Sequence, residues 1–247
     1  MAGRCRGGGA PVGPDGLQRC VPVREFGVAG GRRAAVPVVT GPYDGAVLVK
    51  WIRLTVVDRR GFERGQRKWA GLLGEPGFRG QAGGWSRSRP GVAHLVGFWE
   101  SRAFYDSFMA RSHDRLAAAQ TGTYKDPQVR LFEHEFDVKV GFRPAFGDAD
   151  VLRLAHCQVR EDRVDHFVLM QEKVWNPAMA GSPGMLRGMV GRAPGEEFLV
   201  LSMWQSAAER GKYRPERVER LALRAQIAAD VQAIAGDVVQ LEPSWTV

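Results

Sequence analysis

The segment Phe98-Trp99-Glu100-Ser101 recurs as Met203-Trp204-Gln205-Ser206, at an offset of 105 positions (204 − 99). Pro76-Gly77 recurs in the same order as Pro183-Gly184. Ordered matches spread over a whole unit indicate an internal duplication, which decides the fold before any single motif is considered. We therefore expect two diverged copies of one structural unit.

The residues between these landmarks alternate between strand-like and helix-like patterns. β-Branched and apolar runs predict strands, and apolar residues spaced by three and four predict helices that begin after Asp58 and Ser101. In the first copy the expected strands cover residues 47–56, 78–85, 92–99 and 129–138, with helices over 58–73 and 101–116. In the second copy they include strands over 151–159 and 198–204, with helices over 164–174 and 217–234. The order β-α-β-β-α-β is that of a ferredoxin-like unit.

A second set of matches aligns the final strands of the two copies. Val129, Glu133, Phe136 and Val138 are matched by Val238, Glu242, Trp245 and Val247 at an offset of 109 (238 − 129). The difference between the offsets of 105 and 109 is what short loop insertions produce. Phe136 and Trp245 are therefore expected to share a packing role.

A ferredoxin-like sheet covers one face with its two helices and leaves the other face bare. Two fused copies can bury their bare faces against each other within one chain. We therefore predict an α+β fold in which tandem ferredoxin-like units, residues 46–140 and 151–247, form an intramolecular dimeric α/β barrel. Residues 141–150 would be a linker, and the Gly- and Pro-rich residues 1–45 a disordered tail.

Composition and charge narrow the classes of partner. The chain has 247 residues and a net charge of +8, with arginines scattered over both halves and no stripe along one helix, so we expect no nucleic-acid partner. No apolar stretch approaches the roughly 18 to 20 residues that span a membrane, so we expect a soluble protein without a membrane partner. Cys5, Cys20 and Cys157 form no C-x-x-C or zinc-type cluster, which favours the cytoplasm.

Four segments of the first copy carry a family resemblance. They are Leu48-Val49-Lys50-Trp51-Ile52-Arg53, Gly77 to Ser86, His94-x-x-Gly97-Phe98-Trp99-Glu100-Ser101 and Tyr105-Asp106-x-Phe108-Met109. These segments, within residues 47–138, resemble the YdbC-like family of uncharacterised bacterial proteins. That family is similar in turn to the antibiotic-biosynthesis-monooxygenase-type dimeric α/β-barrel superfamily. The superfamily includes cofactor-free oxygenases, haem-degrading enzymes and members without known chemistry, so the resemblance implies a fold and a class of ligand rather than a reaction.

The resemblance places the ligand between the helices and the sheet of one unit, and two histidines of the first copy are catalytic candidates. His94 lies in an apolar strand, where an imidazole can act as a general base or can be a core histidine bonded to the backbone. His113 is the second candidate, although its neighbour Asp114 is not expected to share its helical face. The haem-ligand position of the haem-degrading relatives falls near Ala118 rather than His113, so no cofactor is expected and haem is the minor alternative.

The substrate-binding candidates are Trp51, Arg53, Trp85, Trp99 and Tyr105. Trp99 is matched by Trp204, which favours a packing role, whereas Trp51 and Trp85 lack an aromatic match and are better candidates for pocket walls. Arg53, in a strand, needs an acidic partner or an anionic ligand if it is buried. No metal site is expected, because alternation along a strand sends His134 to the opposite face from Glu133 and Glu135.

These patterns predict one working cleft in the first copy and a smaller one or none in the second. The favoured function is a small-molecule enzyme of the monooxygenase-like superfamily, which acts without a cofactor on a hydrophobic or aromatic metabolite and uses His94 as its base. The alternative is a non-catalytic small-molecule-binding or stress-responsive barrel. Because fusion already pairs the two sheets, we expect a monomer with an internal pseudo-dimer.

Overall fold

The computed structural model describes residues 47–139, 147–213 and 215–247. The tail expected over residues 1–45 lies outside the described residues, as do residues 141–146 of the expected linker. Among the helices of the described ranges, none is long and apolar enough to cross a membrane.

The first unit follows the predicted order of strands and helices. Its elements are β1 (Leu48–Val56), α1 (Arg59–Gln66), the 3-10 helix η1 (Arg67–Gly74), β2 (Phe78–Ser86), β3 (Val92–Trp99), α2 (Arg102–Arg111), α3 (His113–Ala117), the 3-10 turn η2 (Ala118–Gln120) and β4 (Tyr124–Asp137). The carboxylate of Asp58 caps α1 by accepting a hydrogen bond from the Gly61 amide, and Ser101 caps α2 in the same way through the Phe104 amide. The two capping residues found in the sequence therefore start the two helices.

The second unit repeats this order with shorter helices. Its elements are β5 (Val151–Val159), η3 (Glu161–Arg163), α4 (Val164–Met170), the π-helical turn η4 (Gln171–Trp175), α5 (Asn176–Ala180), β6 (Met185–Ala193), β7 (Glu197–Trp204), α6 (Ala207–Gly211), α7 (Pro215–Arg224), α8 (Ile227–Asp230), β8 (Val231–Leu241) and η5 (Pro243–Trp245).

The prediction of one helix over residues 217–234 is wrong for the C-terminal part of this range. Gln226 has a left-handed φ of 51°, which separates α7 from α8. Beyond Asp230 the chain extends and pairs with β5, with Ile234 opposite Cys157. The apolar spacing of this segment suits a helix, but hydrogen bonding to the neighbouring strand determines its conformation instead.

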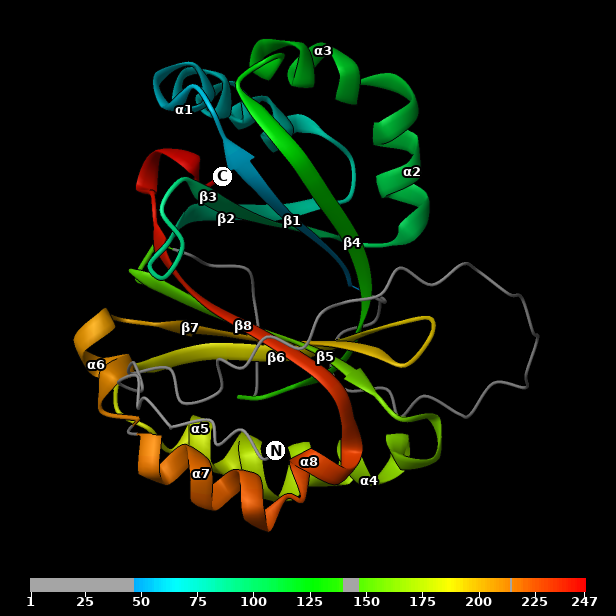
Figure 1. Cartoon of the computed structure of the whole chain (residues 1–247). Coiled ribbons are helices and arrows are strands. Elements are labelled where there is room, and N and C mark those ends of the chain that lie inside the picture. Colours follow the sequence, from blue (N-terminus) through cyan, green and yellow to red (C-terminus); the bar gives the residue numbers. More distant parts are fainter. Residues whose placement is uncertain (1–46, 140–146, 214) are drawn as a thin grey trace, which may run out of the picture.

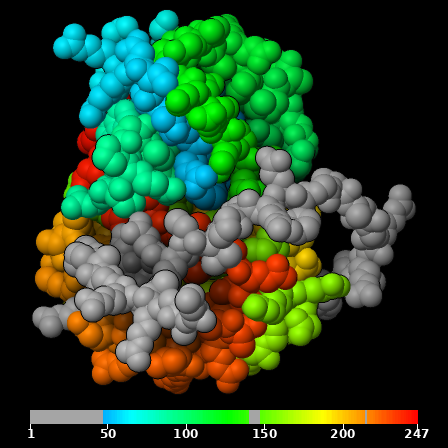
Figure 2. Space-filling view, viewed as in Figure 1, coloured from blue at the N-terminus to red at the C-terminus, as the bar shows by residue number. Residues whose placement is uncertain are grey.

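The strands form one closed barrel in the order β1-β3-β2-β8-β5-β7-β6-β4. Each unit contributes four strands in the same order, β4-β1-β3-β2 and β8-β5-β7-β6, and antiparallel pairing of β2 with β8 and of β4 with β6 joins them. In Figure 1 the helices of the first unit cover one side of the barrel and those of the second unit cover the other. Figure 2 shows the two units as stacked lobes, blue to green and yellow-green to red. The tandem ferredoxin-like barrel predicted from the duplication is confirmed.

Strand register corrects the alignment of the last strands. Leu48 of β1 lies opposite Glu133, and its counterpart Val151 of β5 lies opposite Gln240. Glu133 therefore corresponds to Gln240 at an offset of 107 (240 − 133), and not to Glu242 as the offset of 109 predicted. Sequence letters alone do not fix register, because a shift of two residues preserves the face that each side chain occupies.

The ends of the final strands are exchanged between the units. Phe136, near the end of β4, packs against the helical core of the second unit. Trp245, which follows β8, is fully buried in the first unit, where its ring lies 5.4 Å from that of Phe62 and 5.2 Å from that of Trp85. The shared packing role expected for Phe136 and Trp245 is therefore present, and each side chain completes the core of the opposite unit.

Candidate functional site

His94 is enclosed within the barrel wall and both of its ring nitrogens are bonded. Its side chain is 0% exposed. The Trp51 indole N–H donates to Nδ1 at 3.1 Å, and Nε2 lies 2.9 Å from a carboxylate oxygen of Asp237. Because an indole nitrogen can only donate, Nδ1 is the acceptor and Nε2 carries the proton that is donated to Asp237. Burial lowers the pKa of His94, so the ring is neutral and has no free lone pair for a substrate.

Asp237 of β8 holds several groups from the β2–β3 hairpin. Its carboxylate accepts hydrogen bonds from His94, from the Arg89 guanidinium at 2.7 Å and from the Ser88 hydroxyl at 3.1 Å. Burial alone would raise the pKa of Asp237, but the hydrogen bonds from His94 and Arg89 hold it well below its usual range. His94, the predicted general base, is thus one member of a network that joins the two units at Asp237, and this geometry does not support a role in proton transfer.

The two tryptophans expected to form pocket walls lie on opposite faces of the sheet. Trp51 lies inside the barrel, where its ring stacks on His94 at 5.9 Å. Trp85 lies outside, between Phe62 and Trp245, with the Arg59 guanidinium 4.4 Å above its ring. The structure therefore does not bring these tryptophans together.

Trp99, Tyr105 and His113 pack together between the helices and the sheet of the first unit, whereas Arg53 faces the barrel interior. Trp99 stacks on Phe108 at 4.9 Å and contacts Tyr105 at 5.8 Å, and His113 lies 5.9 Å from Phe108. Contrary to expectation, His113 Nδ1 lies 2.9 Å from a carboxylate oxygen of the adjacent Asp114. That contact forms at the first turn of α3, and Asp114 is fully exposed, so the carboxylate is a weak orienting group.

Lys50 is a buried cation that sequence reasoning missed. Its side chain points from β1 toward the helices, and its ammonium lies 5.3 Å from the centre of the Tyr105 ring. Burial lowers the pKa of Lys50 to about 8. Its position in the VKW run is that of any strand residue, so only the packing reveals that the amine is enclosed.

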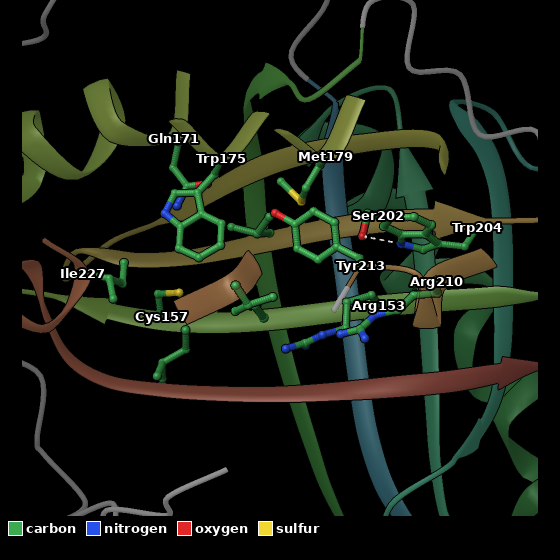
Figure 3. A pocket seen from close by; sticks show the side chains of 14 residues that line it. Arg153, Cys157, Gln171, Trp175, Met179, Ser202, Trp204, Arg210, Tyr213 and Ile227 are labelled. Carbon is green, nitrogen blue, oxygen red and sulfur yellow. Dashed lines mark hydrogen bonds between the residues drawn. The ribbon is translucent and has the colours of Figure 1, made fainter. Parts of the chain in front are cut away.

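A cavity of about 100 Å³ lies in the second unit, between its sheet and its helices (Figure 3). The sheet side is formed by β5, β7 and β8, and the other side by η4 and the helices α5 to α8 together with Tyr213. The side chains that matter for its chemistry are Cys157, Gln171, Trp175, Met179, Ser202 and Tyr213. The working cleft was predicted in the first unit, whereas this cavity lies in the second, which was expected to hold a smaller one or none.

The difference between the units has a packing cause. Ser206 caps α6 as Ser101 caps α2, so Tyr213 corresponds to Phe108 at the shared offset of 105 (213 − 108). In the first unit the large aromatic side chains fill the space over the sheet. In the second unit the position of Tyr105 is occupied by Arg210, and the ring of Tyr213 lies 6.2 Å from that of Trp204. The copy that is richer in aromatic residues is therefore the better filled one.

Three polar atoms at the cavity are buried without a hydrogen-bond partner among the described residues. They are Oε1 of Gln171, Nε1 of Trp175 and the hydroxyl of Tyr213. Leaving such a group unpaired costs roughly 1–3 kcal/mol. Gln171 and Trp175 both lie on the π-helical turn η4, a rare conformation that is frequent at functional sites. In Figure 3 the Tyr213 hydroxyl is directed toward the side on which Trp175 lies.

Two ionisable side chains of the cavity, Tyr213 and Cys157, are held in their neutral forms, and Arg153 and Arg210 also line it. Burial raises the pKa of Tyr213 to about 12 and that of Cys157 also to about 12. The phenol is therefore a hydrogen-bonding group, and the thiol is not a nucleophile at neutral pH. Trp204 is satisfied within the protein, since its indole N–H donates to the Ser202 hydroxyl at 3.0 Å. Besides these two arginines, the cavity thus offers one indole donor, one amide acceptor and one phenol within a mainly apolar wall.

Comparison with solved structures defines the class of fold. A putative monooxygenase from Fusobacterium nucleatum covers 80% of this chain and 93% of its own, with a TM-score of 0.63 and 8% identity. A putative monooxygenase from Lactobacillus acidophilus covers 82% and 98%, with a TM-score of 0.59 and 15% identity. A haem-binding protein from Thermus thermophilus covers 81% and 92%, with a TM-score of 0.53 and 11% identity. The chain has the fold of the monooxygenase-like dimeric α/β barrels.

Sequence comparison adds a match to a family model and a match to a curated relative. Residues 48–132 match the family described as "Domain of unknown function (DUF4937)". The uncharacterised protein YdbC of Bacillus subtilis (strain 168) is 39% identical over 57 residues, which are 22% of this chain and 48% of YdbC. The match thus spans about half the length of this relative. The resemblance of the first unit to YdbC is confirmed.

Proposed function

We propose that the protein binds a small, neutral, mainly apolar molecule in the cavity of the second unit. The observation that carries this proposal is the set of three unpartnered polar atoms, on Gln171, Trp175 and Tyr213, around one apolar space. A ligand with one hydrogen-bond acceptor and one donor would satisfy the indole and the amide. The described residues that line the cavity include no carboxylate to pair with a cationic ligand.

The volume limits the size of the ligand. Pockets for drug-sized ligands measure roughly 300–1,000 Å³. A buried apolar cavity of about 150 Å³ in another protein accommodates benzene. A cavity of about 100 Å³ that is partly open therefore suits a molecule of about one ring, such as a simple phenol.

Binding without catalysis is the better supported form of this proposal. His94, the expected base, faces the barrel interior, and Cys157 and Tyr213 are held protonated. The second candidate is oxidation of a bound hydrophobic or aromatic metabolite without a cofactor. Its support is the name "putative monooxygenase" carried by two proteins of the same fold.

Haem does not fit the residues of this cavity. A protein of the same fold is described as haem-binding. None of the described side chains that line it is a histidine, and the macrocycle is far larger than about 100 Å³. His113, the earlier haem candidate, lies in the other unit with its ring against Trp69 and Phe108.

A binding measurement with phenol tests the proposal. We expect saturable binding of phenol to the full chain by isothermal titration calorimetry. We expect Tyr213→Phe to weaken it by about 2- to 12-fold, the range set by loss of one neutral hydrogen bond. Tyr105→Phe is the matched control, because that phenol lies in the first unit, and its affinity should equal that of the unaltered protein. No saturable binding, or equal binding by the Tyr213 variant, contradicts the proposal.

The same samples separate binding from oxidation. Oxygen consumption and product formation are followed while phenol is present at saturation. Binding without oxygen uptake supports the non-catalytic form. Turnover that disappears in Tyr213→Phe and persists in Tyr105→Phe supports the second candidate.

A further inference from the structure

One end of the barrel is lined by charged side chains. The antiparallel register places Arg53, near the end of β1, opposite His94 of β3 and Gln128 of β4. Charged and imidazole groups of both units surround it: Arg89, Arg130, His156, Glu197 and Asp237. The remaining interior of the barrel is apolar, so this charged end is a distinct feature of the molecule.

Among the charged side chains at this end of the barrel, Arg53 has no counterion within the described residues. Its guanidinium donates to the neutral amide oxygen of Gln128 at 2.5 Å, and within the described part of the chain it forms no ion pair. Burial and the like charges of Arg89 and Arg130 lower the pKa of Arg53. A guanidinium held half-buried beside two others is unfavourable unless an anion joins them.

The nearby carboxylates are already bonded to other groups. Asp237 accepts from His94, Arg89 and Ser88, and also from the backbone amide of Val238 at 2.8 Å.

Glu197 accepts two hydrogen bonds of 3.1 Å from Arg130, and its carboxylate lies 3.2 Å from His156 Nε2. Three guanidinium groups therefore face two carboxylates. In addition, Nε of Arg89 is buried and lacks an acceptor among the described residues.

We propose that this end of the barrel binds a small oxyanion, a phosphate or a carboxylate, through Arg53 together with Arg89 and Arg130. The planar guanidinium fork matches the oxygens of either anion and favours them over a spherical ion such as chloride. The site is separate from the cavity of the second unit, because it faces the barrel interior, whereas the cavity lies between the outer face of the sheet and the helices. The two sites are proposed to bind different classes of ligand, so that one proposal can be wrong while the other holds.

Calorimetric titration of the full chain with phosphate, and separately with acetate, tests this site. Both titrations are carried out at constant ionic strength set with sodium chloride, so that general screening does not change. We expect saturable binding of at least one of the two anions, and the stronger of the two identifies the oxyanion class. Failure of both to bind overturns the proposal.

Arg53→Gln should weaken the binding by about tenfold or more, as expected for loss of a hydrogen bond to a charged group. Arg87→Gln is the matched control. That arginine lies on the adjoining hairpin but is exposed and donates to Gln240, so its removal should leave the affinity unchanged. Equal binding by Arg53→Gln and the unaltered protein overturns the proposal.

Stability provides a second readout. In chloride buffer Arg53→Gln should melt at the same temperature as the unaltered protein or higher, because it removes an unpaired charge. If that variant does not fold, Arg53→Lys decides the question, since it keeps the charge and loses the planar fork. A severalfold loss of affinity in Arg53→Lys supports the site, and unchanged affinity contradicts it.

Discussion

The side chain of Asp237 joins the two copies at a single buried carboxylate. The sequence marked His94 as a candidate base because an imidazole lies in an apolar strand, and Trp51 as a pocket wall because it has no aromatic match in the second copy. It could not show that both ring nitrogens of His94 are bonded, since Asp237 lies 143 positions away along the chain. The bonding of His94 depends on a tertiary contact that no local pattern records.

Removal of the carboxylate should be strongly destabilising. Asp237→Ala leaves the His94 N–H and part of the Arg89 guanidinium buried without their acceptor. We expect a loss of roughly 3–5 kcal/mol in the free energy of unfolding, as for a buried pair that loses one partner. Urea denaturation at pH 7 measures it. Asp106→Ala, which removes only the exposed contact with Arg102, should leave the midpoint unchanged.

The neutral state of His94 predicts a dependence of stability on pH. Burial lowers its pKa in the folded protein, so the unfolded chain binds the proton more readily. This contribution to stability is fully present above the unfolded pKa of about 6.5 and is lost as the pH falls below it. Urea midpoints should therefore fall more between pH 7.5 and pH 5 in the unaltered protein than in His94→Gln. Equal falls in both proteins would show that this imidazole is protonated in the fold.

At the scale of elements, the positions of strands and helices followed from the sequence more closely than their ends. β3 and β5 have the predicted bounds, because β-branched runs between turn residues fix both of their ends. β4 begins five residues before the expected Val129 (129 − 124), and its first residues pair with β1 although they are polar and exposed. The π-helical turn η4 was not predicted, since no residue pattern distinguishes it from an ordinary helix.

Substitution of Gln226, which lies between α7 and α8, tests the left-handed conformation that separates these two helices. Gln226 has a φ of 51°, a conformation that a side chain disfavours and glycine adopts freely. Gln226→Gly should raise the thermal midpoint slightly, whereas Gln226→Val should lower the free energy of unfolding by about 1–2 kcal/mol. Thermal and urea unfolding of both variants measure these changes. A lower midpoint in the glycine variant than in the valine variant would contradict the left-handed assignment.

At the scale of the molecule, the duplication predicted the architecture, whereas the cavity lies in the copy that was expected to hold a smaller one or none. Aromatic side chains kept only in the first copy were interpreted as pocket walls. Tyr105, one of the substrate-binding candidates, packs against Trp99, which in turn stacks on Phe108. Large aromatic residues are compatible with a pocket or with a filled core, and only their mutual distances distinguish the two.

The closed barrel predicts the state of association. Each unit's sheet is already covered by the other, and pairing of β2 with β8 and of β4 with β6 leaves no exposed strand edge in the described barrel. We therefore expect the full chain to sediment as a monomer at micromolar concentration. A stable dimer that persists on dilution would show that another surface of the molecule is an interface.

The exchange of strand ends has a consequence for synthesis on the ribosome. Phe62 and Trp85 emerge early, but Trp245, which packs against both of them, is translated only near the end of the second unit. The core of the amino-terminal unit therefore stays incomplete while the remainder of the chain is synthesised. A nascent chain in this interval exposes apolar surface of the kind that chaperones bind. The exchange of strand ends stabilises the finished barrel. It also makes the first unit dependent on chaperones, or on fast translation, until Trp245 has been synthesised.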